Sequence, residues 1–190
     1  MHSVRLTCFA LGFWLAGGLF MAFVATQNFR SVDRLLQEPN PVAHLKLKAL
    51  DDPRQVLRYQ VSEQNRFYFE YWEIAQLILG ALLFFFILFA TREDKVTLGI
   101  VVMMILITAA QRFYLTPQIV TLGRAQDFGP SVKGFSALHM SYVSVEMSKW
   151  ILGFGVASRL VIGHRRRRSR SEVRNELDMI DKANHRHINR

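Results

Sequence analysis

The feature that most constrains this chain is a set of apolar segments long enough to cross a membrane. They cover residues 6–26, 70–90, 96–115 and 141–163 of the 190-residue sequence. A helix rises about 1.5 Å per residue, so about 20 residues cross the roughly 30 Å hydrocarbon core of a bilayer. A soluble helical bundle would instead show a polar stripe along every helix. We therefore predict an all-α fold in which residues 1–163 form a four-helix transmembrane bundle and residues 164–190 form a basic tail.

The first apolar segment has an alternative interpretation as a cleavable signal peptide, because a basic residue, Arg5, precedes it. The apolar run is long for a signal peptide, and residues 24–27 match a cleavage site poorly. We therefore expect a membrane helix that stays in the protein.

Basic residues predict the orientation of the bundle. The run Arg165–Arg168 directly follows the fourth segment, and Lys and Arg near membrane helices favour the cytoplasmic side. Four crossings then place both termini in the cytoplasm, and residues 27–67 become a long outer loop. Seven Lys or Arg residues between Asn28 and Phe67 argue against this orientation. We expect a protein integral to the membrane, in the cytoplasmic (inner) membrane of a bacterium.

Two charged residues, Glu146 and Lys149, lie well inside the fourth apolar segment. A charge at the centre of a bilayer costs about 3 kcal/mol or more, so each needs a partner, a water-filled cavity or a function. The polar and small residues of this segment recur every three or four positions, at His139, Tyr142, Glu146, Lys149, Gly153 and Ala157. Such spacing places them on one helix face, which we expect to point into the bundle.

Polar residues from three segments fall at a similar depth. Counted at about 1.5 Å per residue from the cytoplasmic ends, five of them lie about 20–24 Å up, in the outer leaflet, and Glu73 lies slightly higher. The five are Gln76, Gln111, Arg112, Glu146 and Lys149. We predict a buried network in which the two basic residues pair with the two acidic ones and the glutamines complete the hydrogen bonding. The network either fixes the register of the helices or forms a small polar site for an ion, a proton or a headgroup.

Prolines and glycines predict where the helices stop. Pro39, Pro41 and Pro53 punctuate the first connection, Pro117 ends the third segment, and residues 118–134 form a loop. In the tail, Ser171 caps a short helix with a narrow apolar edge at Val173, Leu177 and Ile180. We expect Arg165, Arg166, Arg167 and Arg168 to contact anionic lipid headgroups rather than nucleic acid. Docking of the tail helix onto a partner subunit is the alternative.

No motif of a known catalytic site or cofactor site is found in the sequence. Cys8 is the only cysteine, so an intramolecular disulfide cannot form. His139 could bind a ligand or lie at an interface, but a metal needs three or four ligands and only Glu73 or Glu146 could join it. We therefore expect no metal, no cofactor and no enzymatic activity.

Several short motifs resemble a known family. They are Gly12, Trp14, Gly17 and Gly18 in the first segment, Asn28, Phe29 and Arg30 after it, Pro117, and the run with Phe135, Leu138 and His139. Over roughly residues 6–163 the chain resembles the bacterial family catalogued as domain of unknown function 4149, which is related to the eukaryotic transmembrane-protein-205 group. The resemblance implies a four-span helical protein and no established reaction or cofactor. It also implies that the long first loop and the basic tail are additions.

Two functions are compatible with this sequence. The preferred one is a non-enzymatic accessory or scaffolding subunit of a larger membrane complex, with lipids and protein subunits as partners. The alternative is a small transport protein, or one that handles metal ions or protons, using the polar network. A bundle without an internal cavity would favour the first function, and a cavity that reaches Lys149 would favour the second.

Overall fold

The computed structural model describes residues 2–37, 40–91, 95–127 and 132–188, and its regular elements are all helical. In chain order they are α1 (His2–Leu36), α2 (Pro41–Lys48), α3 (Pro53–Phe85), a π-helical turn (Phe86–Thr91), α4 (Lys95–Ala110), a second π-helical turn (Gln111–Leu115), α5 (Thr116–Asp127) and α6 (Phe135–Ile188). The predicted all-α class is confirmed.

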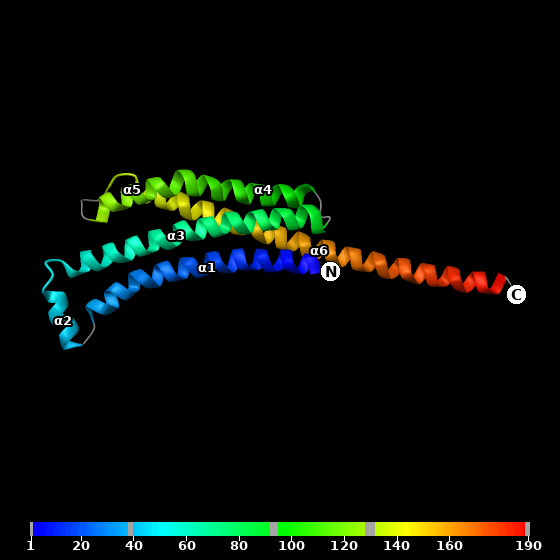
Figure 1. Ribbon diagram of the computed structural model, residues 1–190, viewed down its shortest axis with the longest axis horizontal. Helices are drawn as coiled ribbons and strands as arrows, with labels where there is room; N and C mark the ends of the chain where they lie inside the picture. The colour runs from blue at the N-terminus through cyan, green and yellow to red at the C-terminus, as the bar shows by residue number, and fades with distance from the viewer. Residues whose placement is uncertain (1, 38–39, 92–94, 128–131, 189–190) are drawn as a thin grey trace.

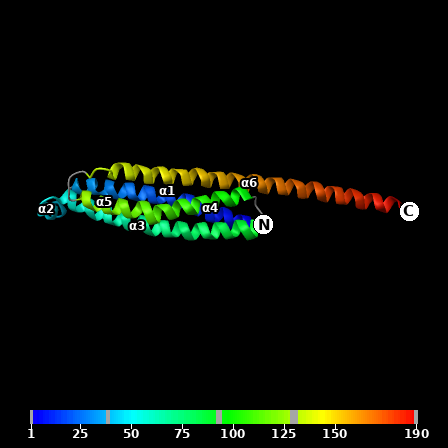
Figure 2. The ribbon, with the colours of Figure 1, turned by 90° about the horizontal axis from the view of Figure 1, so that it is seen from above.

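Four long helical segments pack side by side. Helix α1 contacts α3, α3 contacts α4, α4 contacts α6, and α6 contacts α1, so the packing closes around a common axis (Figures 1 and 2). Helices α4 and α5 follow one another and together form one of the four segments. The short α2 lies at one end of the bundle, whereas the N-terminus lies at the other end, where α6 leaves it (Figure 1).

Three of these helical segments are long and apolar enough to cross a membrane, namely Val4–Leu36, Pro53–Phe89 and Lys95–Asp127. Large apolar side chains cover their outer surfaces, and Phe9, Phe89 and Phe113 are 73–74% exposed. Exposed apolar surface of this extent is typical of proteins in contact with lipid. The chain is thus a membrane-integral helical protein. The fourth predicted segment, 141–163, is not among the three.

Most of the connection predicted over residues 27–67 is helical. Helix α1 continues to Leu36 and α3 begins at Pro53. The Asp52 side chain accepts a hydrogen bond from the Gln55 backbone N–H at 3.0 Å, which caps the helix. Proline is well tolerated in the first turn, so Pro53 starts α3. At about 1.5 Å per residue its 33 residues reach about 50 Å, well beyond a bilayer core of about 30 Å.

The prediction that Pro117 ends the third segment is wrong. Proline has no N–H, and its ring collides with the carbonyl four residues earlier in a regular helix. The preceding residues, Gln111–Leu115, form a π-helical turn, and the Thr116 N–H bonds to the Gln111 carbonyl five residues back. The wider turn accommodates the proline. Residues 118–127, predicted as loop, therefore belong to α5.

The tail does not form a separate short helix. Helix α6 runs without interruption from Phe135 to Ile188, which is about 81 Å at about 1.5 Å per residue. The last proline of the sequence is Pro130, so no residue in α6 forces an end to the helix. The second half of α6 projects past the other helices (Figure 1).

The apolar core lies in the half of the bundle nearer the N-terminus. Its buried members are Ala10, Leu11, Trp14, Leu83, Ile87, Val101, Met104, Val156 and Leu160. Gly80 of α3 lies at the edge of this core, close to the ring of Trp14. The half nearer α2 is packed around polar side chains and cavities instead.

A methyl group added at Gly80 should destabilise the bundle. Its Cβ would lie 2.7 Å from Cγ1 of Ile105 and 3.1 Å from Cζ3 of Trp14. We expect Gly80→Ala to lower the free energy of unfolding in detergent by about 1–3 kcal/mol, the usual cost of overpacking. Gly99→Ala is the matched control, because nothing lies within 4 Å of a Cβ there, and alanine favours a helix by about 1 kcal/mol. Equal unfolding curves for the two variants would contradict this packing.

Candidate functional site

Lys149 of α6 is one of two fully buried charged residues of the predicted network. Its side chain is fully buried, and its Nζ donates hydrogen bonds to Oε1 of Gln76 at 2.5 Å and to Oε1 of Glu146 at 2.7 Å. Nε2 of Gln111 donates to the same Glu146 oxygen at 3.2 Å. The ammonium group is therefore neutralised within α6 and hydrogen-bonded to α3, while the carboxylate also contacts the second π-helical turn.

Glu73 of α3 forms a second polar cluster one helical turn away. It is fully buried, and its Oε1 accepts hydrogen bonds from Thr116 Oγ1 at 2.5 Å and from the Tyr142 hydroxyl at 3.0 Å. These bonds join α3 to α5 and α6. Thr116 was not predicted, because Pro117 was interpreted as the end of a helix. Tyr142 belongs to the predicted inward face of α6 and could have been included on that ground.

Two details of the predicted network are wrong. The only ion pair in this layer among the described residues joins Glu146 and Lys149 within one helix, not across helices. Arg112 is partly buried and forms no ion pair or hydrogen bond with either glutamate. Neighbouring residues of a helix point about 100° apart, so the inward position of Gln111 turns Arg112 away.

Unpaired polar atoms are concentrated at this layer. Five buried side-chain atoms have no hydrogen-bond partner among the described residues: Trp72 Nε1, Glu73 Oε2, Gln76 Nε2, Gln111 Oε1 and Trp150 Nε1. Buried polar groups in proteins are nearly always paired with protein or water, so each exception needs an explanation. All five belong to the polar layer or to the wall of the cavity beside it.

A cavity of about 420 Å³ lies between α1, α3, α5 and α6, in the half of the bundle nearer α2. Trp72, Trp150, Tyr142 and Glu146 are among the residues that line it. The side chain of Glu146 is 19% exposed, whereas that of its partner Lys149 is fully buried. The cavity thus reaches the carboxylate of the ion pair but not the ammonium group.

Two glycines of α1 make room for the tryptophans of this cavity. A Cβ on Gly17 would lie 2.2 Å from Cη2 of Trp72, and one on Gly18 would lie 3.0 Å from Nε1 of Trp150. Both indoles therefore rest directly on the backbone of α1. Small residues in membrane helices usually allow a neighbouring backbone to approach, and here they accommodate side chains.

His139 also lines the cavity, but near its outer part. Its side chain is exposed, and its ring stacks on that of Phe135 with centroids 6.1 Å apart. No group of three or more His, Cys, Asp or Glu side chains that could hold a metal ion occurs in the described part of the chain. His139 is therefore placed as a wall residue of the cavity.

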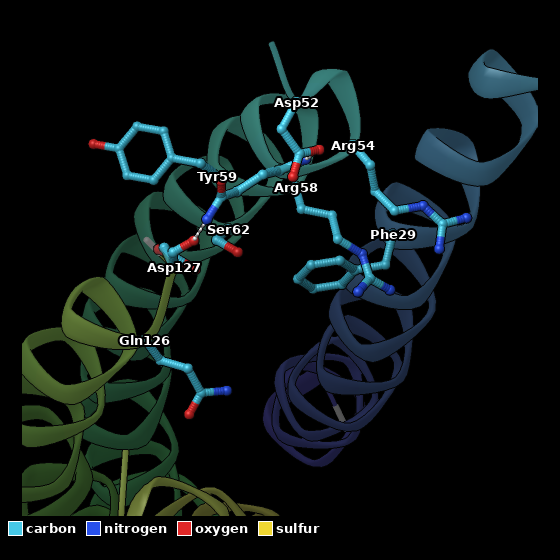
Figure 3. A pocket seen from close by; sticks show the side chains of 9 residues that line it. Phe29, Asp52, Arg54, Arg58, Tyr59, Ser62, Gln126 and Asp127 are labelled. Carbon is cyan, nitrogen blue, oxygen red and sulfur yellow. Dashed lines mark hydrogen bonds between the residues drawn. The ribbon is translucent and has the colours of Figure 1, made fainter. Parts of the chain in front are cut away.

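A second cavity, of about 470 Å³, lies at the α2 end of the bundle (Figure 3). Arg54, Arg58 and Asp127 are among its lining residues, and it shares Phe29 and Ser62 with the first cavity. The two cavities are therefore neighbours along the bundle.

Ion pairs hold this end of the bundle together. Arg66 of α3 lies 2.6 Å from Glu63 and 2.7 Å from Asp127 of α5. Arg124 of α5 donates two hydrogen bonds to the Glu63 carboxylate, at 2.8 and 2.9 Å. Charge-assisted pairs with this two-point geometry fix orientation as well as distance.

The predicted headgroup contacts of Arg165–Arg168 lie outside what the structure describes, because only the backbone of this stretch is placed. Comparison with protein-family models, with curated proteins and with solved structures finds no match. The resemblance to domain of unknown function 4149 therefore has no support from these comparisons and stays a prediction.

The ion pair of the polar layer should show strong coupling in a double-mutant cycle. We expect Glu146→Gln and Lys149→Met, made singly and together, to give a coupling energy of about 1–3 kcal/mol in unfolding experiments, because each single change leaves a poorly solvated charge. The control cycle uses Asp33→Asn and Arg54→Gln. That pair is 2.8 Å apart with side chains 45% and 58% exposed, so its coupling should be about 0–1 kcal/mol. Equal coupling in the two cycles would show that Lys149 is not buried.

Proposed function

We propose that the chain crosses a membrane four times, with α6 as the fourth crossing helix and both termini in the cytoplasm. Helix α6 is the least apolar of the four, but its buried Lys149 and partly buried Glu146 neutralise each other at 2.7 Å, which lowers the cost of placing them in a bilayer. The N-terminus and the point where α6 leaves the bundle lie at the same end (Figure 1). The family resemblance and the basic residues after 163 support a bacterial cytoplasmic membrane.

Within this topology, the function supported best is that of a small transport protein, part of the second of the two functions considered from the sequence. The cavity does not reach Lys149, as that function was expected to require. The observation that carries the proposal is a cavity of about 420 Å³ whose mainly apolar wall includes the partly exposed carboxylate of Glu146. Ligand sites are typically cavities of about 300–1,000 Å³, with mostly apolar walls and a few polar groups.

The chemistry of the Glu146 carboxylate defines what a ligand must offer. The indole N–H groups of Trp72 and Trp150 are buried, and that of Trp150 lies against α1 at Gly18, so neither is open to a ligand in the cavity. The Glu146 carboxylate accepts hydrogen bonds through one oxygen, Oε1, from Lys149 and Gln111. A ligand group that donates a hydrogen bond to this carboxylate would therefore suit the cavity.

The accessory-subunit function remains a second candidate, because the projecting half of α6 presents an unpartnered apolar surface. Leu177, Met179 and Ile180 are 56–72% exposed there. If this surface binds another subunit, truncation after residue 163 should reduce the size of the complex isolated in mild detergent. An unchanged size would remove the support that α6 gives to this function.

Cysteine accessibility tests the ligand cavity. The natural chain has one cysteine, so Cys8→Ser gives a cysteine-free background. In it, Val120→Cys places a thiol in the cavity wall at a partly buried position, and Ile151→Cys places one on the outer face, where the native side chain is 71% exposed. Because only the solvated thiolate reacts rapidly, we expect a charged thiosulfonate reagent to label Val120→Cys at least about ten times faster in detergent. Similar slow rates at both sites would overturn the transport function.

Reporter fusions test the topology. We expect green fluorescent protein fused after residue 190 to fluoresce in bacterial cells and alkaline phosphatase at the same position to be inactive, because the C-terminus follows a basic run that favours the cytoplasm. The same two reporters inserted in the stretch between α2 and α3 should give the opposite result. Active phosphatase at the C-terminus would contradict the proposed orientation.

A further inference from the structure

We infer that the ligand of the cavity between α1, α3, α5 and α6 is a lipophilic amine, whose protonated amino group binds the Glu146 carboxylate while a compact apolar body occupies the rest of the space. The inference rests on the proposed function and names the substrate class of the same site. It is drawn from the side chains that line this one cavity.

Glu146 is the acidic group that the cavity offers to a ligand. Its side chain lines the cavity and is 19% exposed. The hydrogen bonds from Lys149 and Gln111 both end on Oε1, so Oε2 accepts none among the described residues. An ionised carboxylate has about four acceptor sites on its two oxygens. An amino group in the cavity can therefore bind Oε2 while Lys149 keeps its own contact.

The Lys149 ammonium group leaves this place free for a second cation. It is fully buried, is not among the groups that line the cavity, and is held by Gln76 of α3 at 2.5 Å as well as by Glu146. Buried triads of one carboxylate with two cationic groups are known in proteins. A ligand amine would complete such a triad without separating the ion pair of α6.

Aromatic side chains flank the Glu146 carboxylate on the same face of α6. Tyr142 lies four residues before Glu146 and Trp150 lies four residues after it, so each is about one helical turn away. All three line the cavity, as does Phe69 of α3, whose ring centroid lies 6.0 Å from that of Tyr142. Aromatic rings attract a nearby cation through the negative potential of their faces. These surroundings favour an ammonium group over a neutral hydroxyl as the donor to Glu146.

The same cavity is unsuited to an anion. Among the described residues that line it, Arg66 is the one strong base. Its guanidinium group is already paired with Glu63 at 2.6 Å and with Asp127 at 2.7 Å. An anionic head would have to displace one of these carboxylates and would be repelled by Glu146.

The rest of the wall suits a compact apolar body. Small and branched apolar side chains from three helices form it, namely Ala22, Ala25, Ile119, Val120 and Val143. Burial of apolar surface against them would stabilise binding. The volume of about 420 Å³ is near the lower end of the usual range for ligand cavities, about 300–1,000 Å³. A cage or ring system therefore fits better than a long chain.

Protection of a cavity cysteine from labelling tests the inference in the full chain. The thiol of Val120→Cys lies in the cavity wall, and that of Ile151→Cys, on the outer face, reports any effect of a probe on the detergent micelle. The probes share one adamantyl cage and differ in their heads: adamantylmethylamine, adamantylmethanol and adamantanecarboxylic acid. Like lysine, the primary amine is protonated at neutral pH.

We expect the amine to slow the reaction of Val120→Cys with an anionic thiosulfonate reagent in a saturable manner, and to leave Ile151→Cys unaffected. The alcohol should protect at least about ten times more weakly, because a charge-assisted hydrogen bond is roughly twice as strong as a neutral one. The acid should protect more weakly still.

Matched variants connect the preference for the amine to Glu146. The double change Glu146→Gln with Lys149→Met removes both members of the ion pair, so it leaves no unpaired charge behind. In it, we expect the amine and the alcohol to protect Val120→Cys equally, within about threefold. Glu70→Gln is the control, because it removes a carboxylate from α3 three residues before Glu73, at a position that is not among those lining the cavity. It should keep the tenfold difference.

The outcomes distinguish the inference from the proposed function. If the alcohol protects as well as the amine while Glu146 is intact, the ammonium head is wrong and the cavity stands; this result does not depend on the folding of any Glu146 variant. If the tenfold difference persists in the double variant, Glu146 is not the binding group. If no probe protects, the lipophilic amine is wrong, and the labelling rate of Val120→Cys without any probe decides the transport function separately.

Discussion

The bundle depends on neutralising one buried ammonium group, that of Lys149. Its fully buried position would cost several kcal/mol for an isolated charge. Glu146 supplies the opposite charge one turn earlier, and Gln76 on α3 accepts a further hydrogen bond. Gln111 of the second π-helical turn also donates a hydrogen bond to this carboxylate. The π-helical turn, α3 and α6 must therefore be in register before α6 can be buried here. The least apolar helix is therefore the one whose position is most specifically determined.

The second π-helical turn connects local backbone chemistry to this layer. Pro117 cannot donate a hydrogen bond, and the wider turn before it lets the helix continue into α5. That continuation brings Thr116 to the Glu73 carboxylate, and Arg124 and Asp127 to their partners on α3. A helix that ended at the proline would lack these contacts and would leave the cavity without its α5 wall.

Helical periodicity and apolar length made part of this structure predictable. They indicated the all-α class, and the spacing of three and four residues indicated that Tyr142 and Lys149 face inward. Prolines were harder to interpret, because Pro53 starts a helix and Pro117 is absorbed within one. A π-helical turn also contains one more residue than an α-helical turn, which changes the directions of the Gln111 and Arg112 side chains. The spacing of apolar residues in the sequence does not reveal such a turn. The shape of the cavity depends on the contacts of Trp72 with Gly17 and of Trp150 with Gly18. These contacts join segments far apart in the sequence, so local sequence patterns do not predict them.

The two halves of the bundle are packed differently. Near the N-terminus, nine buried apolar residues fill the interior. In the other half the indoles of Trp72 and Trp150 lie against Gly17 and Gly18 of α1, and a cavity of about 420 Å³ remains beside them. The unpaired indole N–H groups are sealed against the helices, whereas the Glu146 carboxylate of the ion pair is 19% exposed and lines the cavity. The proposed ligand would therefore meet the ion pair at its acidic member, which can accept a further hydrogen bond without separating Lys149 from its partner.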